Sequence, residues 1–445
     1  MSASRTGGEH TLVRAIGVTG LAATTFNIMI GGGIFVLPAA AAAALGERAP
    51  VAYVICAVAM SLVLICFAEA GSRVSLTGGP YAYVSQAFGP FVGFLSGVLL
   101  WVMAVFAMSA VMSALAGSAA VLWPTLAQPI PRALLLVAVL VLITTVNVRG
   151  VRGGARLVEL MAVVKLLPLF AFVVAGALIG HAAAAAPAAR VGGDLGGTVA
   201  ILIFAFAGSE SALVPSGEVR DPSRTVPRGL AIAMITVMLL YIAVQVIAKR
   251  VLGVGALAAA SAAPLSAAAA RIAGPLGASI VAVAAVLSMF GNVSGMTLAT
   301  PRALYALGRD GFVPFFSESF ARVHPEFRTP YVAIVVQSTI IGCLATTNGF
   351  VALAVLANVS VLTLYLVCCA ATIQLRRLDV QQAGVPFRMP RGRAVPYVAI
   401  VVLAWILWHS PVHQMLVVLA VILVAACLFV ITAPYRRAAP PVPTP

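Results

Sequence analysis

The stretch NIMIGGGIFVLP, residues 27–38, interrupts an apolar run that is otherwise long enough to cross a bilayer. Glycine in a helix interior costs about 1 kcal/mol relative to alanine. The consecutive glycines Gly31, Gly32 and Gly33 are therefore predicted to break a membrane helix. In hydrocarbon, such a break is tolerated only where its free N–H and C=O groups find partners in protein, water or a ligand.

Composition places this break in a polytopic membrane protein. Of 445 residues, 62% are hydrophobic and 9% are charged, and the mean hydropathy is +1.10, which excludes a soluble globular protein. Apolar runs of roughly 20 residues recur along the chain and predict an all-α fold of about 12 transmembrane helices. They lie at 14–45, 50–70, 86–120, 131–148, 157–180, 196–217, 229–252, 275–306, 330–347, 350–375, 395–409 and 413–433.

The formal charge of +15 follows the positive-inside rule and does not indicate a nucleic-acid partner. With both termini cytoplasmic, most of the 27 Lys and Arg residues fall in cytoplasmic segments. We therefore expect a multi-pass protein of the cytoplasmic membrane, with the lipid bilayer as its surroundings. The six cysteines lie in predicted spans without metal-ligand spacing, so we expect neither a metal nor a cofactor.

A second break is predicted in the sixth span, within IFAFAGSESALVPSGEV, residues 203–219, where Gly208 and Glu210 lie in mid-membrane. Interrupted helices at matching positions of two halves indicate a transporter binding site at the midplane. The N–H groups that open one half-helix suit a carboxylate, and the carbonyl groups that end another suit an ammonium, so a zwitterion fits both. The alternative is that the glycines form a packing notch between closely spaced helices.

Span one begins inside and span six begins outside, so two five-helix units of opposite orientation would place the two breaks in corresponding positions. This organisation has five parts. They are a cytoplasmic tail at 1–13, a first five-helix repeat at 14–180, a second, inverted repeat at 196–375, two additional spans at 395–433 and a cytoplasmic tail at 434–445.

Five motifs occur together and in order: IGGGIF in span one, FAEAGSRVSLTGGPYAYVSQAFGPFVGFLSG across spans two and three, NVRGVRGGARLVELMAVVK into span five, FAFAGSESALVPSGEVRDPSRTVPRG in span six and RALYALGRDGFVP after span eight. By these motifs the chain resembles the amino acid-polyamine-organocation (APC) superfamily of transporters. Its members share the inverted five-helix-repeat fold of the sodium-coupled leucine transporter, usually with two further helices. The resemblance covers most of residues 14–330.

The resemblance implies a substrate site at the two breaks. The N–H groups of the three glycines would hold the carboxylate, and carbonyl groups beside the breaks would receive the amino group, with Phe204 covering the substrate as a gate. Without the motif, Phe204 reads as an ordinary lipid-facing or core aromatic. The implied substrate-binding residues are Met29, Gly31, Gly32, Gly33, Phe204, Ala207 and Gly208. Gly32 replaces the small serine usual in the family, which removes one side-chain donor.

The chain contains 25 arginines and only two lysines, one of which is Lys165. Lys165 lies about eight residues into the fifth span. An unpaired charge there costs at least ~2.5 kcal/mol, so a function is expected unless the helix starts late and Lys165 lies near the surface. The resemblance places Lys165 at the second sodium site, as in sodium-independent members. It implies an ammonium near the carbonyl groups of Asn27 or Ile30 and near Asn292 and Ser294. This ammonium could release a proton or act as a tethered cation.

The remaining membrane carboxylates are assigned by their depth. Two interpretations of Glu210 are equally supported. It is either a proton carrier or gate residue, or a structural acceptor for the N–H groups that the break frees. Glu69 and Glu218 end spans two and six beside Arg73 and Arg220, where we expect ion-paired anchors.

These observations predict a secondary active transporter of an amino acid that works by alternating access. We expect it to be sodium-independent, with proton symport or exchange. The region of Trp101, Met103 and Ser109 offers no acid to hold a cationic side chain, which favours a neutral amino acid, with an amine, cationic amino acid or polyamine exchanger as the alternative. A channel or membrane enzyme is the rival class, but neither a catalytic constellation nor a repeated pore lining is present. Oligomeric state stays open.

Overall fold

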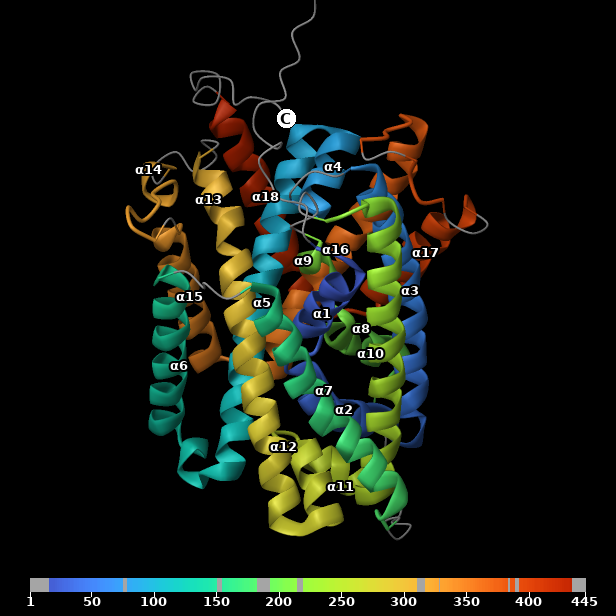
Figure 1. Ribbon diagram of the computed structural model, residues 1–445, viewed down its shortest axis with the longest axis vertical. Coiled ribbons are helices and arrows are strands. Elements are labelled where there is room, and N and C mark those ends of the chain that lie inside the picture. The colour runs from blue at the N-terminus through green and yellow to red at the C-terminus, as the bar shows by residue number, and fades with distance from the viewer. Residues whose placement is uncertain are drawn as a thin grey trace, which may run out of the picture.

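The computed structural model describes residues 16–74, 78–149, 154–181, 193–213, 219–309, 317–327, 329–382, 385–388 and 392–433. In this part of the chain the named elements are all helices, and the long ones run roughly parallel to the long axis of the molecule (Figure 1). The polytopic all-α fold predicted from the sequence is confirmed.

The predicted spans correspond to helices in chain order. The first five are α1 (Val18–Met29) with α2 (Gly33–Leu45), α3 (Ala49–Arg73), α5 (Pro90–Leu122), α6 (Pro129–Arg149) and α7 (Gly154–Leu178). The next five are α8 (Leu195–Phe206) with α9 (Ser209–Ala212), α10 (Pro222–Leu252), α12 (Pro264–Ala299), α15 (Tyr331–Thr347) and α16 (Phe350–Arg377). The last two are α17 (Ala394–Trp408) and α18 (Val412–Ile431).

Short helices connect the long ones: η2 (Gly46–Arg48), α4 (Pro80–Phe88), η3 (Pro124–Ala127), α11 (Val254–Ala259), α13 (Pro301–Arg309) and α14 (Ser317–Phe320). Three predicted helix starts differ from the structure. The seventh span, α10, starts at Pro222 and not at residue 229. The third span starts at Pro90 and not at residue 86, because Gly89 adopts a φ of 84° and Pro90 then opens a new helix. The eighth helix starts at Pro264 and bends at Gly274, where φ is 62°.

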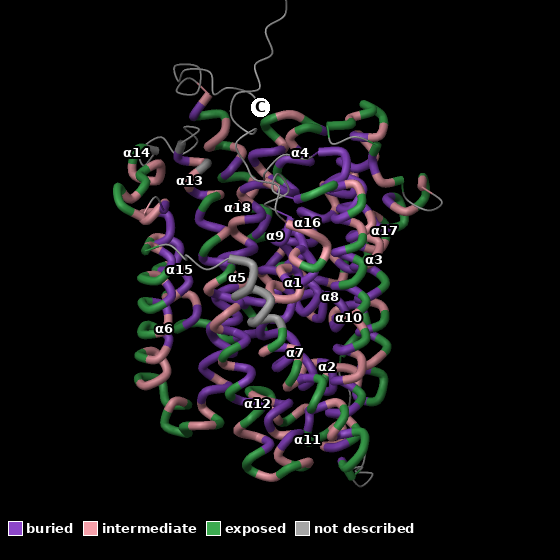
Figure 2. The backbone as a smooth tube through the Cα atoms, viewed as in Figure 1, coloured by how far each residue is buried: buried purple, intermediate pink, exposed green. Residues whose placement is uncertain are grey.

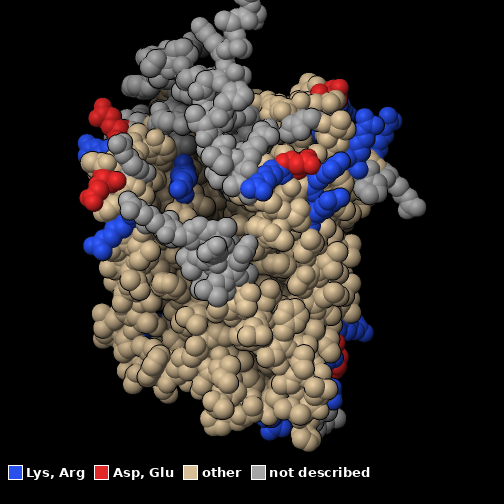
Figure 3. Space-filling model, in the orientation of Figure 1, with Lys and Arg blue, Asp and Glu red and all other residues tan. Residues whose placement is uncertain are grey.

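Eight described helical stretches are long and apolar enough to cross a bilayer, and four shorter apolar helices accompany them. The count of twelve spans stays a prediction, because α2 and α3 join through η2 into one stretch, Gly33–Arg73, and α1 is short. The outer helices expose apolar side chains, among them Leu134 and Val141 on α6 and Val424 on α18. Figure 2 shows exposed residues along α6. On the face drawn in Figure 3, the charged side chains of the described residues gather toward the two ends, and the surface shown between them is mostly uncharged. Lipid tails cover such a surface.

The two predicted helix breaks are present and interlock. α1 ends at Met29 and α2 begins at Gly33, while α8 ends at Phe206 and α9 begins at Ser209. A Cβ added to Gly33 would lie 3.0 Å from the Cα of Ala205, and one added to Gly208 would lie 2.8 Å from the Cγ2 of Ile28. The glycines therefore fit both interpretations, the helix break and the packing notch. They interrupt the helices, and they also let the two breaks approach each other closely.

An ion-paired cluster ties the end of α3 to the end of α16. Glu69 is 1% exposed, and its carboxylate accepts from Arg73 Nε at 3.1 Å and from Arg376 Nε at 2.6 Å and Nη2 at 2.7 Å. The structure thus contains the expected Arg73 partner and adds Arg376 from a helix about 300 residues away in sequence. The other expected anchor, Glu218, lies outside the described residues.

Candidate functional site

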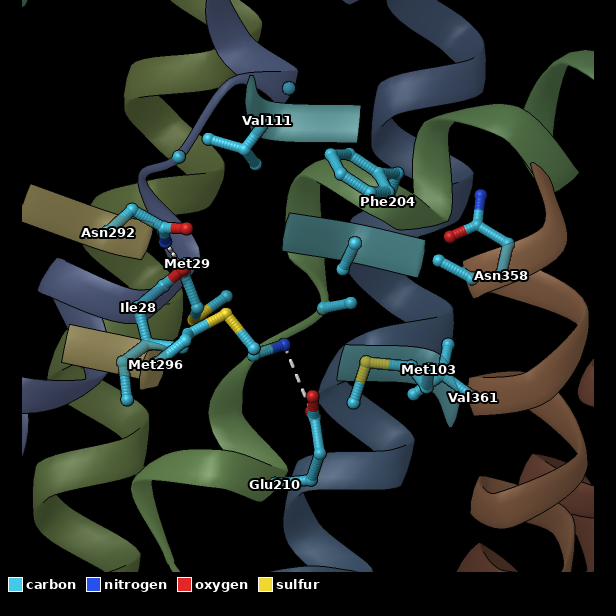
Figure 4. A pocket seen from close by; sticks show the side chains of 16 residues that line it. Ile28, Met29, Met103, Val111, Phe204, Glu210, Asn292, Met296, Asn358 and Val361 are labelled. Carbon is cyan, nitrogen blue, oxygen red and sulfur yellow. Dashed lines mark hydrogen bonds between the residues drawn. The ribbon is translucent and has the colours of Figure 1, made fainter. Parts of the chain in front are cut away.

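A buried cavity lies where the two breaks meet, and α5, α12 and α16 complete its walls (Figure 4). It is narrow, with a cavity volume of about 30 Å³, and its lining is mostly apolar with a few polar groups, as in small-molecule sites. Of the residues predicted to bind substrate, those that line it are Met29, Gly31, Gly33, Phe204, Ala207 and Gly208. Gly32 is not in the lining and faces α5 instead, where an added Cβ would lie 3.2 Å from the Cβ of Ala114.

Side chains from other helices satisfy the carbonyl groups that the first break frees at the end of α1. Tyr241 Oη on α10 donates to the carbonyl oxygen of Met29 at 3.1 Å. Asn292 Nδ2 on α12 donates to the carbonyl oxygen of Ile28 at 2.7 Å. Because a helix end in hydrocarbon has no water to bind, these donors make the interruption tolerable.

Lys165 lies on α7 and donates to the carbonyl groups on both sides of the Ile28–Met29 step. Its Nζ is 2.8 Å from the carbonyl oxygen of Asn27 and 3.3 Å from that of Ile30. A cation here complements the partial negative charge at the C-terminal end of α1. Lys165 is 2% exposed and α7 begins at Gly154, so the alternative of a lysine near the surface is excluded.

The eighth span contributes a different serine from the one expected. Ser288 Oγ donates to the carbonyl oxygen of Ile30 at 3.1 Å, whereas Ser294 Oγ accepts from Asn147 Nδ2 on α6 at 3.4 Å. Ser288 and Asn292 are four residues apart and share one face of α12, while a residue two positions beyond Asn292 points to the opposite side. The i, i+4 spacing from Asn292 was the signal that could have identified Ser288.

The second break is organised around Glu210, which is fully buried. Its Oε2 accepts from the N–H of Gly208 at 3.0 Å and from Tyr365 Oη on α16 at 2.6 Å. Glu210 lines the cavity, and its Oε1 accepts no hydrogen bond from any described residue. Glu210 therefore serves as an acceptor for a freed N–H, and one of its oxygens stays open for a further proton or donor.

Phe204 is buried against another aromatic ring and does not face lipid. Its ring meets that of Phe350, at the start of α16, in an edge-on arrangement with centroids 5.3 Å apart. The ring of Phe350 also reaches Gly32, since a Cβ added there would lie 3.6 Å from Phe350 Cε2. The aromatic pair thus joins α8 to α16 over the first break.

Several site residues were missed by sequence reasoning, namely Tyr241, Ser288, Phe350, Asn358 and Tyr365. Polar side chains in the middle of apolar helices were the available signal for four of them. Phe350 carries no such signal, because an aromatic residue at the start of an apolar helix is ordinary.

Interlocked broken helices around a buried cavity, within a bundle whose outer helices expose apolar side chains, define a polytopic membrane transport protein. The amino acid permease family model matches residues 16–444, so the chain belongs to the amino acid permeases of the APC superfamily.

Among its relatives is an uncharacterized transporter of Mycobacterium tuberculosis, 33% identical over 380 residues that cover 79% of this chain and 81% of the relative. The serine/threonine exchanger SteT of Bacillus subtilis is 27% identical over 74% of this chain and 76% of its own length. The branched-chain amino acid permease BcaP of the same organism is 26% identical over 89% and 88%. The chain is thus similar to transporters of different amino acids.

Replacing Tyr365 with phenylalanine is expected to lower the kcat/KM of uptake about tenfold. The substitution removes one hydrogen bond to a buried carboxylate, worth about 1.5 kcal/mol, and tenfold corresponds to about 1.4 kcal/mol. Tyr53→Phe is the matched control, because the Tyr53 hydroxyl is equally buried but has no partner among the described residues. Equal effects of the two substitutions on reconstituted uptake would argue against a role for the Tyr365–Glu210 contact.

Proposed function

We propose that the protein is a sodium-independent secondary active transporter of amino acids that works by alternating access, through proton symport or substrate exchange. The observation that carries the proposal is the Lys165 ammonium, bound to the carbonyl groups of Asn27 and Ile30 at the first break. An ammonium with these oxygen ligands takes the place of a bound sodium ion, so the break has its cation without sodium.

The two poles of an amino acid match the two breaks. The carboxylate accepts from N–H groups at the start of α2, where the helix dipole favours negative charge. In the structure, the N–H of Gly31 donates to the carbonyl oxygen of Met29 at 3.0 Å. Binding exchanges this bond for one to the carboxylate, and the ammonium group takes the carbonyl oxygens of Phe204, Ala207 and the released Met29.

Alternating access follows from the predicted organisation of the chain. The repeats at 14–180 and 196–375 run in opposite directions, and each contributes one broken helix. Movement of one part of the bundle against the other exposes the cavity to one side of the membrane at a time. Phe204, packed against Phe350, acts as the gate over the substrate. The protein resides in the cytoplasmic membrane with both termini inside.

One observation favours an alternative substrate class. Glu210 lines the cavity and its Oε1 has no partner among the described residues, so its carboxylate would attract an amine or the cationic side chain of an amino acid. An exchanger of amines, cationic amino acids or polyamines is therefore the second candidate.

The test is uptake by the purified protein in liposomes, with a panel of labelled neutral amino acids, cationic amino acids and amines. An inward proton gradient, an inward sodium gradient and an internal load of unlabelled substrate are imposed in turn. Symport predicts accumulation driven by the proton gradient, and exchange predicts acceleration by internal substrate only. Sodium-driven accumulation would overturn the proposal, and so would a substrate-induced conductance or the absence of saturable uptake.

A further inference from the structure

Two asparagines from different walls of the cavity each present a buried acceptor without a partner. Asn292 on α12 is 4% exposed and Asn358 on α16 is 1% exposed. Both line the cavity, and Figure 4 places them on opposite sides of it. The Oδ1 atom of each accepts no hydrogen bond from any residue that the structure describes. Buried acceptors are rarely left unpaired, and because these two also line the cavity, a molecule bound there could supply their donors.

The orientation of each amide is determined by its other end. Asn358 Nδ2 donates to the carbonyl oxygens of Ala200 at 2.7 Å and Ile201 at 3.0 Å, both on α8. A reversed amide would place its oxygen against two carbonyl oxygens and lose both hydrogen bonds. The oxygen of Asn358 is therefore held away from α8. Asn292 is held in the same way by the carbonyl group of Ile28.

The two acceptors face different parts of an amino acid. Asn292 binds the end of α1, beside the break where the ammonium and carboxylate of the substrate are expected. Asn358 binds α8 and lies across the cavity from that break, in the part left for the substrate side chain. Its neighbours in the lining include the apolar side chains of Ala357 and Val361. A single fixed acceptor in apolar surroundings suits a small side chain with one hydrogen-bond donor.

We infer that Asn358 determines the side-chain specificity of the transporter, by accepting a hydrogen bond from the hydroxyl group of serine or threonine. The inference rests on the proposed function and adds the substrate class. A site that binds a hydroxyl group rejects an analogue of equal shape that lacks it, because the buried acceptor is then left unpaired. Valine, which has the shape of threonine, is therefore disfavoured, and alanine is disfavoured relative to serine.

The test measures kcat/KM of uptake for the pairs threonine and valine, and serine and alanine, in liposomes. We expect the wild-type protein to prefer threonine to valine about tenfold, which is the size of one hydrogen bond to a buried neutral acceptor. Asn358→Leu keeps the volume and removes the acceptor, so the threonine-to-valine ratio should fall to about one or below. Asn147→Leu is the matched control, because Asn147 is a buried asparagine on α6 outside the cavity lining, and its ratio should stay at the wild-type value.

Each outcome has a distinct meaning. Failure of the wild-type protein to take up any amino acid would refute the proposed function itself. Uptake with valine equal to or better than threonine, or with a cationic amino acid preferred to both, would overturn the assignment of Asn358 while leaving amino acid transport intact. A wild-type ratio retained in Asn358→Leu would overturn it as well. Asn358→Ala, which adds no volume, replaces the leucine variant if the latter does not fold.

Discussion

Gly208→Ala is expected to abolish amino acid uptake. Gly208 has a φ of 123°, a conformation that costs a residue with a Cβ about 1–3 kcal/mol. The added Cβ would also lie 2.8 Å from Ile28 Cγ2 and 3.2 Å from the carbonyl carbon and oxygen of Ile28. The side chain can turn, but the backbone of the first break would have to shift. Displacement there moves the carbonyl groups of α1, on which the site depends.

The measurement is uptake per folded protein, with the folded fraction determined by size-exclusion chromatography and thermal unfolding in detergent. Gly295→Ala is the matched control, since Gly295 lies within α12 and an added Cβ would meet nothing within 4 Å. Alanine there should leave uptake unchanged and slightly raise the unfolding temperature. Uptake by Gly208→Ala within threefold of wild type would contradict the interlocked arrangement of the two breaks.

Lys165→Met is expected to reduce the rate of uptake at least about 100-fold. The substitution keeps the length of the side chain and removes two charge-assisted hydrogen bonds to α1, each worth about 1.5 kcal/mol or more. Their sum of about 3 kcal/mol corresponds to roughly 100-fold. The carbonyl oxygens of Asn27 and Ile30 keep other donors, Asn292 at 3.4 Å and Ser288 at 3.1 Å, so the helix break itself should survive.

Two uptake assays separate the roles of this lysine. Loss of proton-driven accumulation with retention of exchange would identify Lys165 as the proton-carrying group, whereas loss of both would identify a fixed cation. Lys249→Met is the control, because Lys249 is the other lysine of the chain. Lys249 lies in the last turn of α10, about two helical turns beyond Tyr241, and forms an ion pair with the exposed Glu47. Unchanged uptake by Lys165→Met would show that the first break does not need its cation.

Much of this protein could be predicted from the sequence, because the bilayer imposes local rules. A spanning helix needs a long apolar run, so the spans could be read from composition, and consecutive glycines in such a run predicted the first break. The deep position of Lys165 indicated a function, and the resemblance to the APC superfamily implied its place beside the carbonyl groups of Asn27 or Ile30. The close approach of the breaks could be anticipated from their glycines, although not the atoms that meet.

What the sequence by itself determined was the class of fold, the two breaks and the residues that a break exposes, since each depends on chain segments of about 20 residues or fewer. Beyond Lys165 and Asn292, which the resemblance had placed at the first break, the tertiary structure decided which side chains meet those residues. Tyr365 reaches Glu210 across 155 positions and Asn358 reaches Ala200 across 158. Helix rotation and depth set such partners, and a one-residue change in register turns a side chain by about 100°. This is why Ser288 and not Ser294 faces the break, and why the orientation of Asn358 became apparent only once α8 lay against α16.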